Sequence, residues 1–400
     1  MKNLNRRAFL DLLSRLGISV TAIPAFGLEQ SAPQTGTDSS SESQWVLTLG
    51  GSDGPHPPFA YSSRRLLTAP ELHDAPDEWI DRSLQWINYI LHHYRPDVVE
   101  LPERRPALFR LDEILHIQSA PAKPLVQNFY RTRLENAIAE IEQTQVTEGM
   151  RIWRLYNHGA LVRTPSVSFT FDIVPGTRTP GFALAPEVLE RLVAQSDVTF
   201  ISHLHGDHAN ADVARMFLAA GKPVIAPEGL WADDAQLSKQ LTYPKRGIDE
   251  VHDIRVREGK QVLKVVTYPG HQGATVVNNV NFVATPEGFS VLHTGDQSGD
   301  EGQGTDFEWL TQIGHYRHVD VLLCNGWTND LHRIVRGVDP QLVIPGHENE
   351  MSHQIDHREE YTQDYERMFG LNYPFIVMTW GESYSYTRRP SEAGVLLDEN

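Results

Sequence analysis

The spacing of hydrophobic positions along the chain changes at about residue 150. Before that point, the stretch "DEWIDRSLQWINYILHHYRP" ends at a proline and carries apolar residues at helical intervals: Trp79, Leu84, Ile87, Ile90 and Leu91. A second stretch, "PLVQNFYRTRLENAIAEIEQTQ", has a similar pattern. Apolar residues three and four positions apart cover one face of a helix. Residues 44–150 are therefore predicted to form a mainly helical N-terminal extension.

Beyond residue 150, short apolar runs alternate with helical stretches. Runs such as "SVSFTFDIV", "DVTFIS", "KPVIAP", "QVLKVVTYP", "NNVNFVAT", "VDVLLC", "QLVIP" and "PFIVMTW" predict strands. Stretches such as "APEVLERLVAQS", "NADVARMFLAAG" and "QIDHREEYTQDYERMF" predict helices. This mixture predicts a layered α/β domain over residues 151–390, in which helices cover the sheets.

Metal-binding residue types follow directly after several of the apolar runs. The run "DVTFIS" leads into His203, His205, Asp207 and His208, and Asn210 can cap the helix that comes next. Three later runs lead to His271, Asp296 and His347, each close to a glycine that permits a sharp turn. Taken singly, each of these residues has an ordinary structural explanation. Together they predict a metal site, since imidazole and carboxylate are the ligands that zinc takes without thiolates.

This order of motifs resembles that of the metallo-β-lactamase-fold hydrolase superfamily. The resemblance covers residues 151–385 and includes Asp172 in "FTFDIV" and the run "GHQGATVVNNVNFVATPEGFSVLHTGD". It implies a four-layered αββα metallo-β-lactamase-like sandwich. The helical N-terminal extension lies outside that core, so subgroup identity and substrate choice are expected to reside there.

The same resemblance implies a pair of metal ions. The first would be bound by His203, His205 and His271, the second by Asp207, His208 and His347, and Asp296 would bridge both. Asp172 would support the loop from behind. Two divalent ions would lower the pKa of a shared water, so that the resulting hydroxide attacks the substrate, with Asp207 orienting it. Zinc is the favoured metal, and manganese or iron are the alternatives.

Other candidates rest on position alone. His158 in "YNHGAL" lies in a turn early in the fold and is predicted to be catalytic, the alternative being a plain turn histidine. Asn325 and Trp327 follow a predicted strand and either line the pocket or pack in a loop. His293 precedes Asp296 in one strand, on the opposite face, so it is interpreted as structural.

Composition limits the classes of partner. The chain has 400 residues and a formal net charge of -17, which argues against a protein that coats nucleic-acid phosphates. Its single cysteine, Cys324, cannot form an internal disulfide or a thiolate metal cluster, and its apolar surroundings predict a buried thiol. The N-terminal helices leave a homo-oligomer open.

The predicted function is that of a binuclear zinc-dependent hydrolase. It would cleave an ester-type bond, such as a phosphodiester or lactone, in a small molecule or a lipid headgroup. One alternative is a mononuclear iron oxygenase of the same fold, which would not need every ligand of the second ion. The other is a non-catalytic binding protein that keeps the fold.

The N-terminus resembles a twin-arginine export signal. Arg6 and Arg7 precede Phe9 and Leu10, and a short apolar stretch follows that is too weak to span a membrane. Residues 1–30 are predicted to be this signal, the alternative being a short amphipathic helix, and residues 31–43 a disordered Ser/Thr/Pro-rich linker. The expected partner is the twin-arginine export machinery, and the expected location is periplasmic or exported.

Replacement of both Arg6 and Arg7 by lysine is predicted to keep the protein in the cytoplasm, because the export machinery reads the arginine pair. Cell fractionation followed by immunoblotting measures the location, and Arg15→Lys serves as a matched control outside the pair. Export of the double variant at the level of the control would contradict the prediction.

Overall fold

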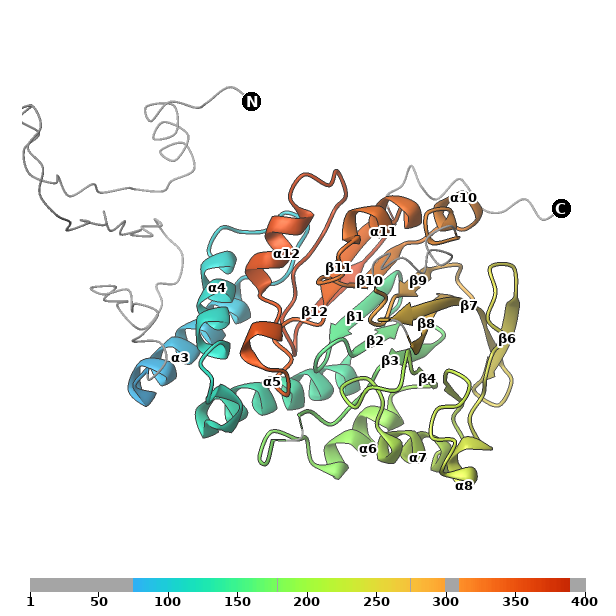
Figure 1. Cartoon of the computed structure of the whole chain (residues 1–400), viewed down its shortest axis with the longest axis horizontal. Coiled ribbons are helices and arrows are strands. Elements are labelled where there is room, and N and C mark those ends of the chain that lie inside the picture. The colour runs from blue at the N-terminus through green and yellow to red at the C-terminus, as the bar shows by residue number, and fades with distance from the viewer. Residues whose placement is uncertain (1–74, 178, 274, 299–308, 389–400) are drawn as a thin grey trace, which may run out of the picture. The chain divides into compact units, whose positions relative to one another are not determined.

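The computed structural model describes residues 75–388, apart from residues 178, 274 and 299–308 (Figure 1). The predicted export signal and linker lie outside the described residues, as does the first part of the predicted helical extension, residues 44–74. No helix in the described ranges has both the length and the apolar character needed to cross a membrane.

Two six-stranded sheets form the centre of the domain. The first has the order β12-β1-β2-β3-β4-β5, in which the strands from β12 to β3 pair antiparallel and β3, β4 and β5 pair parallel. Its strands are β1 (Met150–Arg154), β2 (Ala160–Arg163), β3 (Ser168–Phe171), β4 (Val198–Phe200), β5 (Val224–Ile225) and β12 (Ser383–Tyr386).

The second sheet has the order β11-β10-β9-β8-β7-β6. Its strands are β6 (Val251–Val256), β7 (Gln261–Gln272), β8 (Val276–Ala284), β9 (Ser290–His293), β10 (Val321–Asn325) and β11 (Leu342–Gly346). Strands β9, β10 and β11 run parallel, so their carboxyl ends meet at one edge. Strands β6 to β9 pair antiparallel along the chain.

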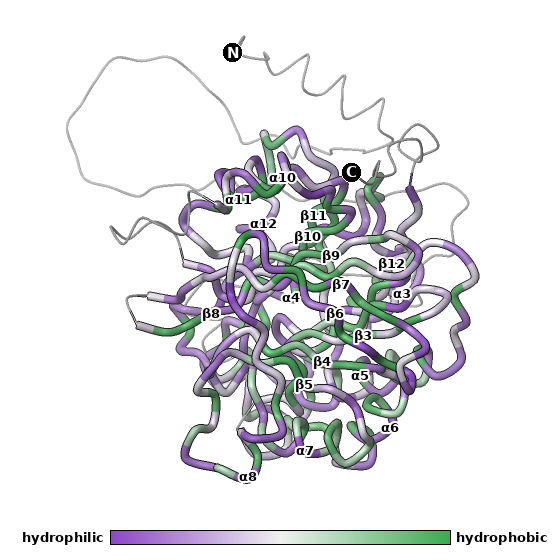
Figure 2. The backbone as a smooth tube through the Cα atoms, turned by 90° about the vertical axis from the view of Figure 1, so that its right-hand side faces the viewer, coloured by the Kyte–Doolittle hydropathy of each residue, from purple (hydrophilic) through white to green (hydrophobic). Residues whose placement is uncertain are grey.

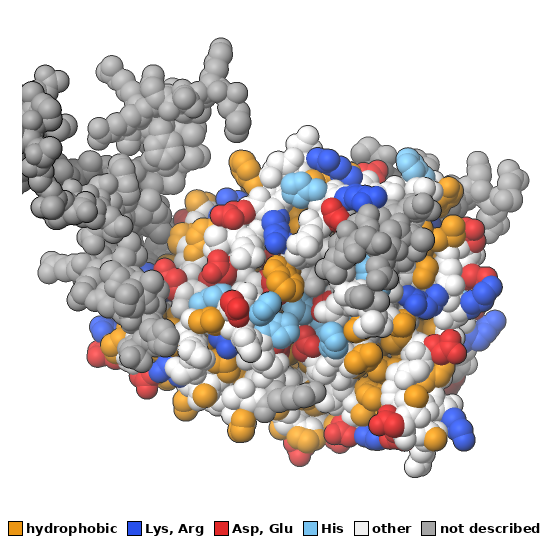
Figure 3. Space-filling model, in the orientation of Figure 1, with side chains coloured by type: hydrophobic (Ala, Val, Ile, Leu, Met, Phe, Trp, Pro, Cys, Tyr) orange, Lys and Arg blue, Asp and Glu red, His pale blue; other side chains and the backbone are white. Residues whose placement is uncertain are grey.

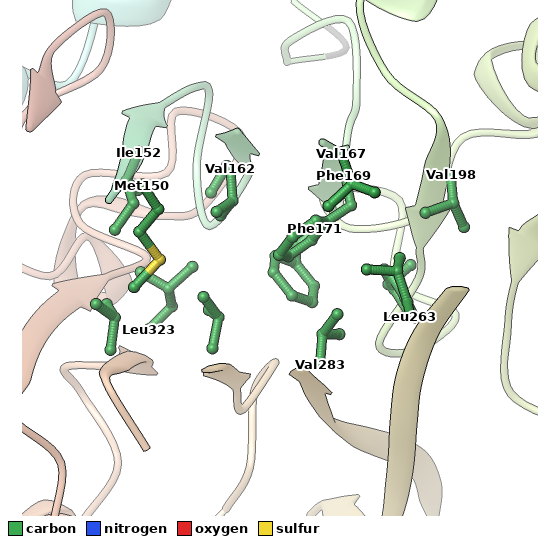
Figure 4. Packing of buried hydrophobic residues seen from close by; sticks show 14 of the residues in the cluster. Met150, Ile152, Val162, Val167, Phe169, Phe171, Val198, Leu263, Val283 and Leu323 are labelled. Atoms are coloured by element: carbon green, nitrogen blue, oxygen red, sulfur yellow. The ribbon is translucent and has the colours of Figure 1, made fainter. Parts of the chain in front are cut away.

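The main hydrophobic core lies between the two sheets. Phe169, Phe171 and Val198 from the first sheet belong to one buried cluster with Leu263 and Val283 from the second (Figure 4). Burial of apolar side chains of this size contributes about 1.5–3 kcal/mol each. The strands carry long apolar stretches along the tube of Figure 2, whereas peripheral loops are mostly hydrophilic.

Helices cover the outer faces of both sheets (Figure 1). The outer face of the second sheet packs against α10 (Ile313–Tyr316), α11 (Leu331–Val338) and α12 (Tyr361–Met368) through a second buried cluster, which includes Cys324. α6 (Pro186–Ala194) and α7 (Ala211–Ala219) lie beside the first sheet, and α8 (Ala235–Ser238) is short. The predicted αββα sandwich and the buried thiol are therefore confirmed.

The helical segment before β1 packs onto this sandwich. It contains α3 (Asp77–His93), α4 (Arg104–Leu115), the 3₁₀ turn η1 (Ala120–Ala122) and α5 (Pro124–Gln143). The two amphipathic stretches seen in the sequence correspond to α3 and α5. Helix α4 is held by a buried ion pair in which Arg104 donates to Glu382, just before β12. A carbonyl of α5, that of Ile141, accepts from the Arg163 guanidinium of β2.

The run "PFIVMTW", predicted as a strand, does not form one. Its only ladder contact among the described residues is an isolated bridge between Phe375 and Val343. The apolar residues that follow enter the core instead, with Ile376 and Met378 packed between the sheets. Beyond these residues, the Thr379 N–H donates to the buried Glu382 carboxylate.

Helix α11 and strand β6 were not predicted from the sequence. The apolar positions of α11 do have helical spacing, but the helix is short and contains Gly337. A Cβ atom at Gly337 would lie 2.3 Å from the Thr311 Cα atom, so glycine is needed for this close approach. In β6, only Ile254 and Val256 are buried, which leaves a weak alternating pattern.

The Arg104–Glu382 pair gives a test of how firmly the N-terminal helices are attached. Arg104→Met would leave the Glu382 carboxylate buried without its main partner, and is predicted to lower the free energy of unfolding by about 3–5 kcal/mol. Arg82→Met is the control, since Arg82 pairs with Glu78 at the surface, and its effect should stay within about 1 kcal/mol. Denaturant titration measures both, and equal small losses would contradict a structural role for the buried pair.

Candidate metal centre

The loop between β4 and α7 presents the first group of metal-binding residues. Asn210 caps α7, as predicted, because its Oδ1 atom accepts from the N–H groups of Asp212 and Val213. Before the cap, the N–H of His208 donates to the His205 carbonyl and closes a single turn. Two anchors, the end of β4 and the cap of α7, therefore fix the turn that carries these side chains.

The second sheet brings two further donors to the same place. Asp296 follows β9 and His347 follows β11, at the carboxyl ends of strands that flank β10. Asp296 Oδ2 lies 3.7 Å from His203 Nε2, 3.2 Å from His208 Nε2 and 3.3 Å from His347 Nε2. Asp207 Oδ2 lies 3.3 Å from the Nε2 atoms of both His208 and His347.

These atoms form two groups that share one carboxylate. Within each group, all donor atoms lie within 4.8 Å of one another. The first group consists of His203, His205 and Asp296, and the second of Asp207, His208, Asp296 and His347. Apart from His271, these are the ligand sets that the sequence predicted, with Asp296 common to both.

Hydrogen bonds determine which ring nitrogen of each histidine carries the hydrogen. His208 Nδ1 lies 2.9 Å from Asp172 Oδ2, and His347 Nδ1 lies 3.3 Å from Glu359 Oε2. A carboxylate only accepts, so Nδ1 of each ring must donate and Nε2 keeps its lone pair in the neutral form. The carboxylates therefore orient both rings with Nε2 toward Asp296.

His203 is oriented through a hydroxyl group. Its Nδ1 lies 2.9 Å from Ser202 Oγ, which itself donates to Asp172 Oδ2 at 2.6 Å. Because the hydroxyl hydrogen is already used, Ser202 accepts from His203 Nδ1. The Nε2 lone pair of His203 consequently points toward Asp296, and this buried atom has no hydrogen-bond partner in the described part of the chain.

The converging atoms fit a divalent cation. Lone pairs of imidazole and carboxylate repel one another unless positive charge lies between them. Tetrahedral ligands about 2.0–2.2 Å from a zinc ion lie about 3.3–3.6 Å apart. The separations among Asp207, His208, Asp296 and His347 are 3.2–3.3 Å where contacts are resolved, close to that spacing. These four separations are compatible with donors that surround one metal ion.

The pKa shifts of the donor histidines also favour a cation at this place. Burial lowers the pKa of His208 and of His347, but the negative charge of Asp296 outweighs it and holds both pKa values well above the ordinary range. Burial lowers the pKa of His203 to about 3, so this ring stays neutral and available as a donor. The potential that attracts protons to the first two rings also attracts a divalent ion, which competes with those protons.

Asp172 lies behind the loop, where the sequence placed it. Its carboxylate is fully buried and accepts from the Ser202 N–H at 2.7 Å, from the Ser202 hydroxyl and from His208 Nδ1. One charged group therefore positions two donor histidines, one directly and one through Ser202. Burial raises the pKa of Asp172, but its hydrogen bond with His208 and the nearby imidazoles outweigh burial, so the pKa is lowered.

His271 is the predicted ligand that the structure does not bring into either donor group. It lies at the end of β7, and its N–H donates to the Gln297 side chain. The neighbouring Gln272 instead reaches the centre, where its Nε2 donates to Asp296 Oδ2 at 3.0 Å. A role for His271 as a ligand of the first ion stays a prediction.

His158 does not reach the cleft. Its ring is fully buried, 4.1 Å from the His293 ring, which in turn stacks on Phe171. The predicted catalytic contact of His158 with substrate has no support from this position. His293 has the structural position that alternation predicted, and its Nε2 contacts the His158 carbonyl.

Several contacts of the centre gave little signal in the sequence. Asn157 Nδ2 donates to Asp207 Oδ2 at 3.1 Å, and Asn325 Nδ2 donates to Asp296 Oδ1 at 3.0 Å. Asn325 thus contacts the shared carboxylate, while Trp327 is partly exposed beside His357. Glu359 follows His347 by twelve residues without a recognisable motif, so only the folded loop brings it to the ring.

A cleft of about 690 Å³ opens beside the donors. One wall is the segment after β3 with Thr177 and Thr179, and the other includes His353 and Arg358. His205 and Asp207 also line it, so a molecule in the cleft contacts the metal-binding loop. On this face, histidine side chains gather near the middle with hydrophobic side chains next to them (Figure 3).

Comparisons with known proteins concern the fold. No family model matches the chain, and no curated protein matches its sequence. The metallo hydrolase Igni18 from Ignicoccus hospitalis is 17% identical, with 60% of this chain and 99% of Igni18 covered and a TM-score of 0.46. The metallo-beta-lactamase fold protein YhfI from Bacillus subtilis is 13% identical, with 60% and 100% covered and a TM-score of 0.41.

A third similar structure has a different activity. CmlA, a diiron beta-hydroxylase from Streptomyces venezuelae, is 14% identical, with 60% of this chain and 55% of CmlA covered and a TM-score of 0.42. Likeness at this level does not transfer a reaction to this chain. The function is therefore argued from the chain's own donor groups and cleft.

Asp172→Asn is predicted to weaken metal binding about 10–100-fold, because an amide orients His208 and Ser202 less well than a carboxylate. Competition with a coloured chelator measures the affinity. Asp212→Asn, at an exposed position on α7, is the control and should bind metal like the parent protein. Equal metal affinity in both variants would show that Asp172 does not position the metal-binding residues.

Proposed function

We propose that the protein is a binuclear zinc-dependent hydrolase that cleaves an ester-type bond in a small molecule or lipid headgroup. The observation that supports this most strongly is the sharing of Asp296 between two donor groups. A carboxylate common to both groups suits a pair of divalent ions held close together. A mononuclear iron oxygenase would bind one ion. That alternative does not explain why Asp207, His208 and His347 form a second group of donors.

Several residues of the chain have separate roles in such a reaction. Divalent ions bound here would lower the pKa of water and polarise the substrate oxygen. Asp207, which lines the cleft, can accept a hydrogen bond from the attacking water and fix its direction. Asn157 holds the Asp207 carboxylate in place through its side-chain amide. No serine or cysteine nucleophile is needed.

The second alternative, a non-catalytic binding protein, would tolerate loss of these residues. Instead, the donors of both groups have hydrogen-bonded partners at His203, His208 and His347 that aim Nε2 inward. Such orientation favours a working metal centre, because ligand geometry is what catalysis by metal ions requires.

The cleft gives some indication of substrate. Its volume of about 690 Å³ suits a small molecule. Leu204, on the metal-binding loop, is 56% exposed and can contact an apolar part of the substrate. An exported location, with the twin-arginine machinery as partner, is proposed from the sequence alone, and a nucleic-acid substrate is not expected for so acidic a chain.

The purified protein is predicted to hydrolyse at least one member of a panel of chromogenic phosphodiesters, lactones and esters, and to lose that activity with a metal chelator. Asp296→Asn should reduce kcat/KM by about 10²–10³, because it weakens the carboxylate shared by both ions. Asp253→Asn, on the outer strand β6, is the matched control and should keep parental activity.

Two results would contradict the proposal. One is full activity of Asp296→Asn. The other is hydrolysis that persists after the metal has been removed and its absence verified by elemental analysis.

A further inference from the structure

Arg358 is a buried cation in the wall of the cleft. It follows the 3₁₀ turn η2 (Ile355–His357), and only 6% of its surface is exposed. Three other arginines in the described ranges are buried as well, and each pairs with a carboxylate: Arg104 with Glu382, Arg110 with Glu113 and Arg154 with Glu348. Arg358 differs from them, because it forms no ion pair with any residue that the structure describes.

Backbone carbonyls hold the guanidinium of Arg358 instead. Its Nε donates to the His353 carbonyl at 3.2 Å, and its Nη1 donates to the Leu115 carbonyl at 2.6 Å. The N–H groups of Nη2 have no acceptor among the described residues, and Nη2 is not enclosed by protein atoms either. Because Arg358 lines the cleft, Nη2 can donate to a molecule that binds there.

The carboxylate of Glu350 influences Arg358 without contacting it. Burial lowers the pKa of Arg358, and the negative charge of Glu350 acts in the opposite direction. The oxygens of Glu350 accept from the Tyr156 hydroxyl, from the N–H and hydroxyl of Ser352 and from the His353 N–H. The guanidinium thus keeps its charge without a direct counterion. A buried charge of this kind is costly to the fold, which favours a functional reason for it.

The other residues of the cleft also suit an anion. Asp207 is the only carboxylate among the described residues that line it, and a metal ion bound by the second donor group would offset that charge. On the other wall, the Thr177 hydroxyl donates to Thr179 Oγ1 at 3.4 Å, so the Thr179 hydroxyl keeps its own hydrogen for a ligand. The cleft would therefore be positive in a chain whose formal net charge is -17.

We propose that Arg358 determines substrate specificity by binding an anionic group, a carboxylate or a phosphate, at a point separate from the bond that is cleaved. The inference rests on the proposed function and narrows it to substrates that carry a negative charge beyond that bond. Because Nε and Nη1 are already used, the anion accepts from Nη2 alone rather than from two nitrogens. Such a contact is present before and during the reaction, so it acts on KM more than on kcat.

The first test uses two 4-nitrophenyl esters of equal chain length, one whose acyl chain ends in a carboxylate and one whose chain ends in a methyl group. In Arg358→Gln, KM for the charged ester should rise about 10–100-fold with kcat nearly unchanged, because a hydrogen bond between charged groups is lost. KM for the neutral ester should stay close to the parent value. Arg358→Lys should recover part of the loss, because lysine keeps the positive charge.

Arg163→Gln is the matched control. Arg163 also donates to backbone carbonyls, those of Ile141, Thr144 and Gln195, but it does not line the cleft. This variant should keep the parent ratio of the two KM values. An equal rise of KM for both esters in Arg358→Gln would indicate a distorted loop and overturn the proposal, as would an unchanged KM for the charged ester.

Binding of glutarate and of glycerol phosphate to the metal-loaded protein tests Arg358 without turnover. Isothermal titration calorimetry should show that the parent protein binds at least one of them and that Arg358→Gln binds it at least about tenfold more weakly. The tighter of the two probes identifies the anionic group. Equal binding by Arg358→Gln, or no binding by the parent, would overturn the inference. Arg358-dependent binding in a protein that hydrolyses no ester would contradict the hydrolase function alone.

Discussion

The structure depends on the convergence of buried lone pairs at Asp296. Imidazole and carboxylate groups from both sheets face one another at 3.2–3.7 Å around this residue, an arrangement that is unfavourable unless protons on the rings or a metal cation lie between them. Hydrogen bonds from behind maintain it: Asp172 holds His208 and Ser202, and Glu359 holds His347. The energy of metal binding would compensate for the burial of these polar groups and would stabilise the junction of the two sheets.

The N-terminal helices take part in this arrangement. Asp112 of α4 accepts from Asn349 and from the N–H groups of Tyr361 and Thr362, so it caps α12 from another helix. Burial raises the pKa of Asp112 to about 7 against the effect of these hydrogen bonds. The loop between His347 and α12 is thereby tied to α4. The helical segment thus contacts the loop that carries His347 and Glu359.

Much of the centre could be predicted from the sequence because its donors follow strands directly. The apolar runs of β4, β9 and β11 locate His203, Asp296 and His347, and parallel strands bring such ends to one edge. Contacts that depend on loop conformation, such as those of Glu359 and His353, had no local signal. Apolar character alone gave a wrong prediction for "PFIVMTW", which fills the core without forming a strand.

The most direct test of the shared-carboxylate centre is anomalous X-ray diffraction from crystals of the metal-loaded protein, recorded on both sides of the zinc absorption edge. Two anomalous peaks are expected, each next to the Asp296 carboxylate, one beside His203 and His205 and the other beside His208 and His347. A single peak, or peaks remote from Asp296, would contradict the shared-carboxylate centre.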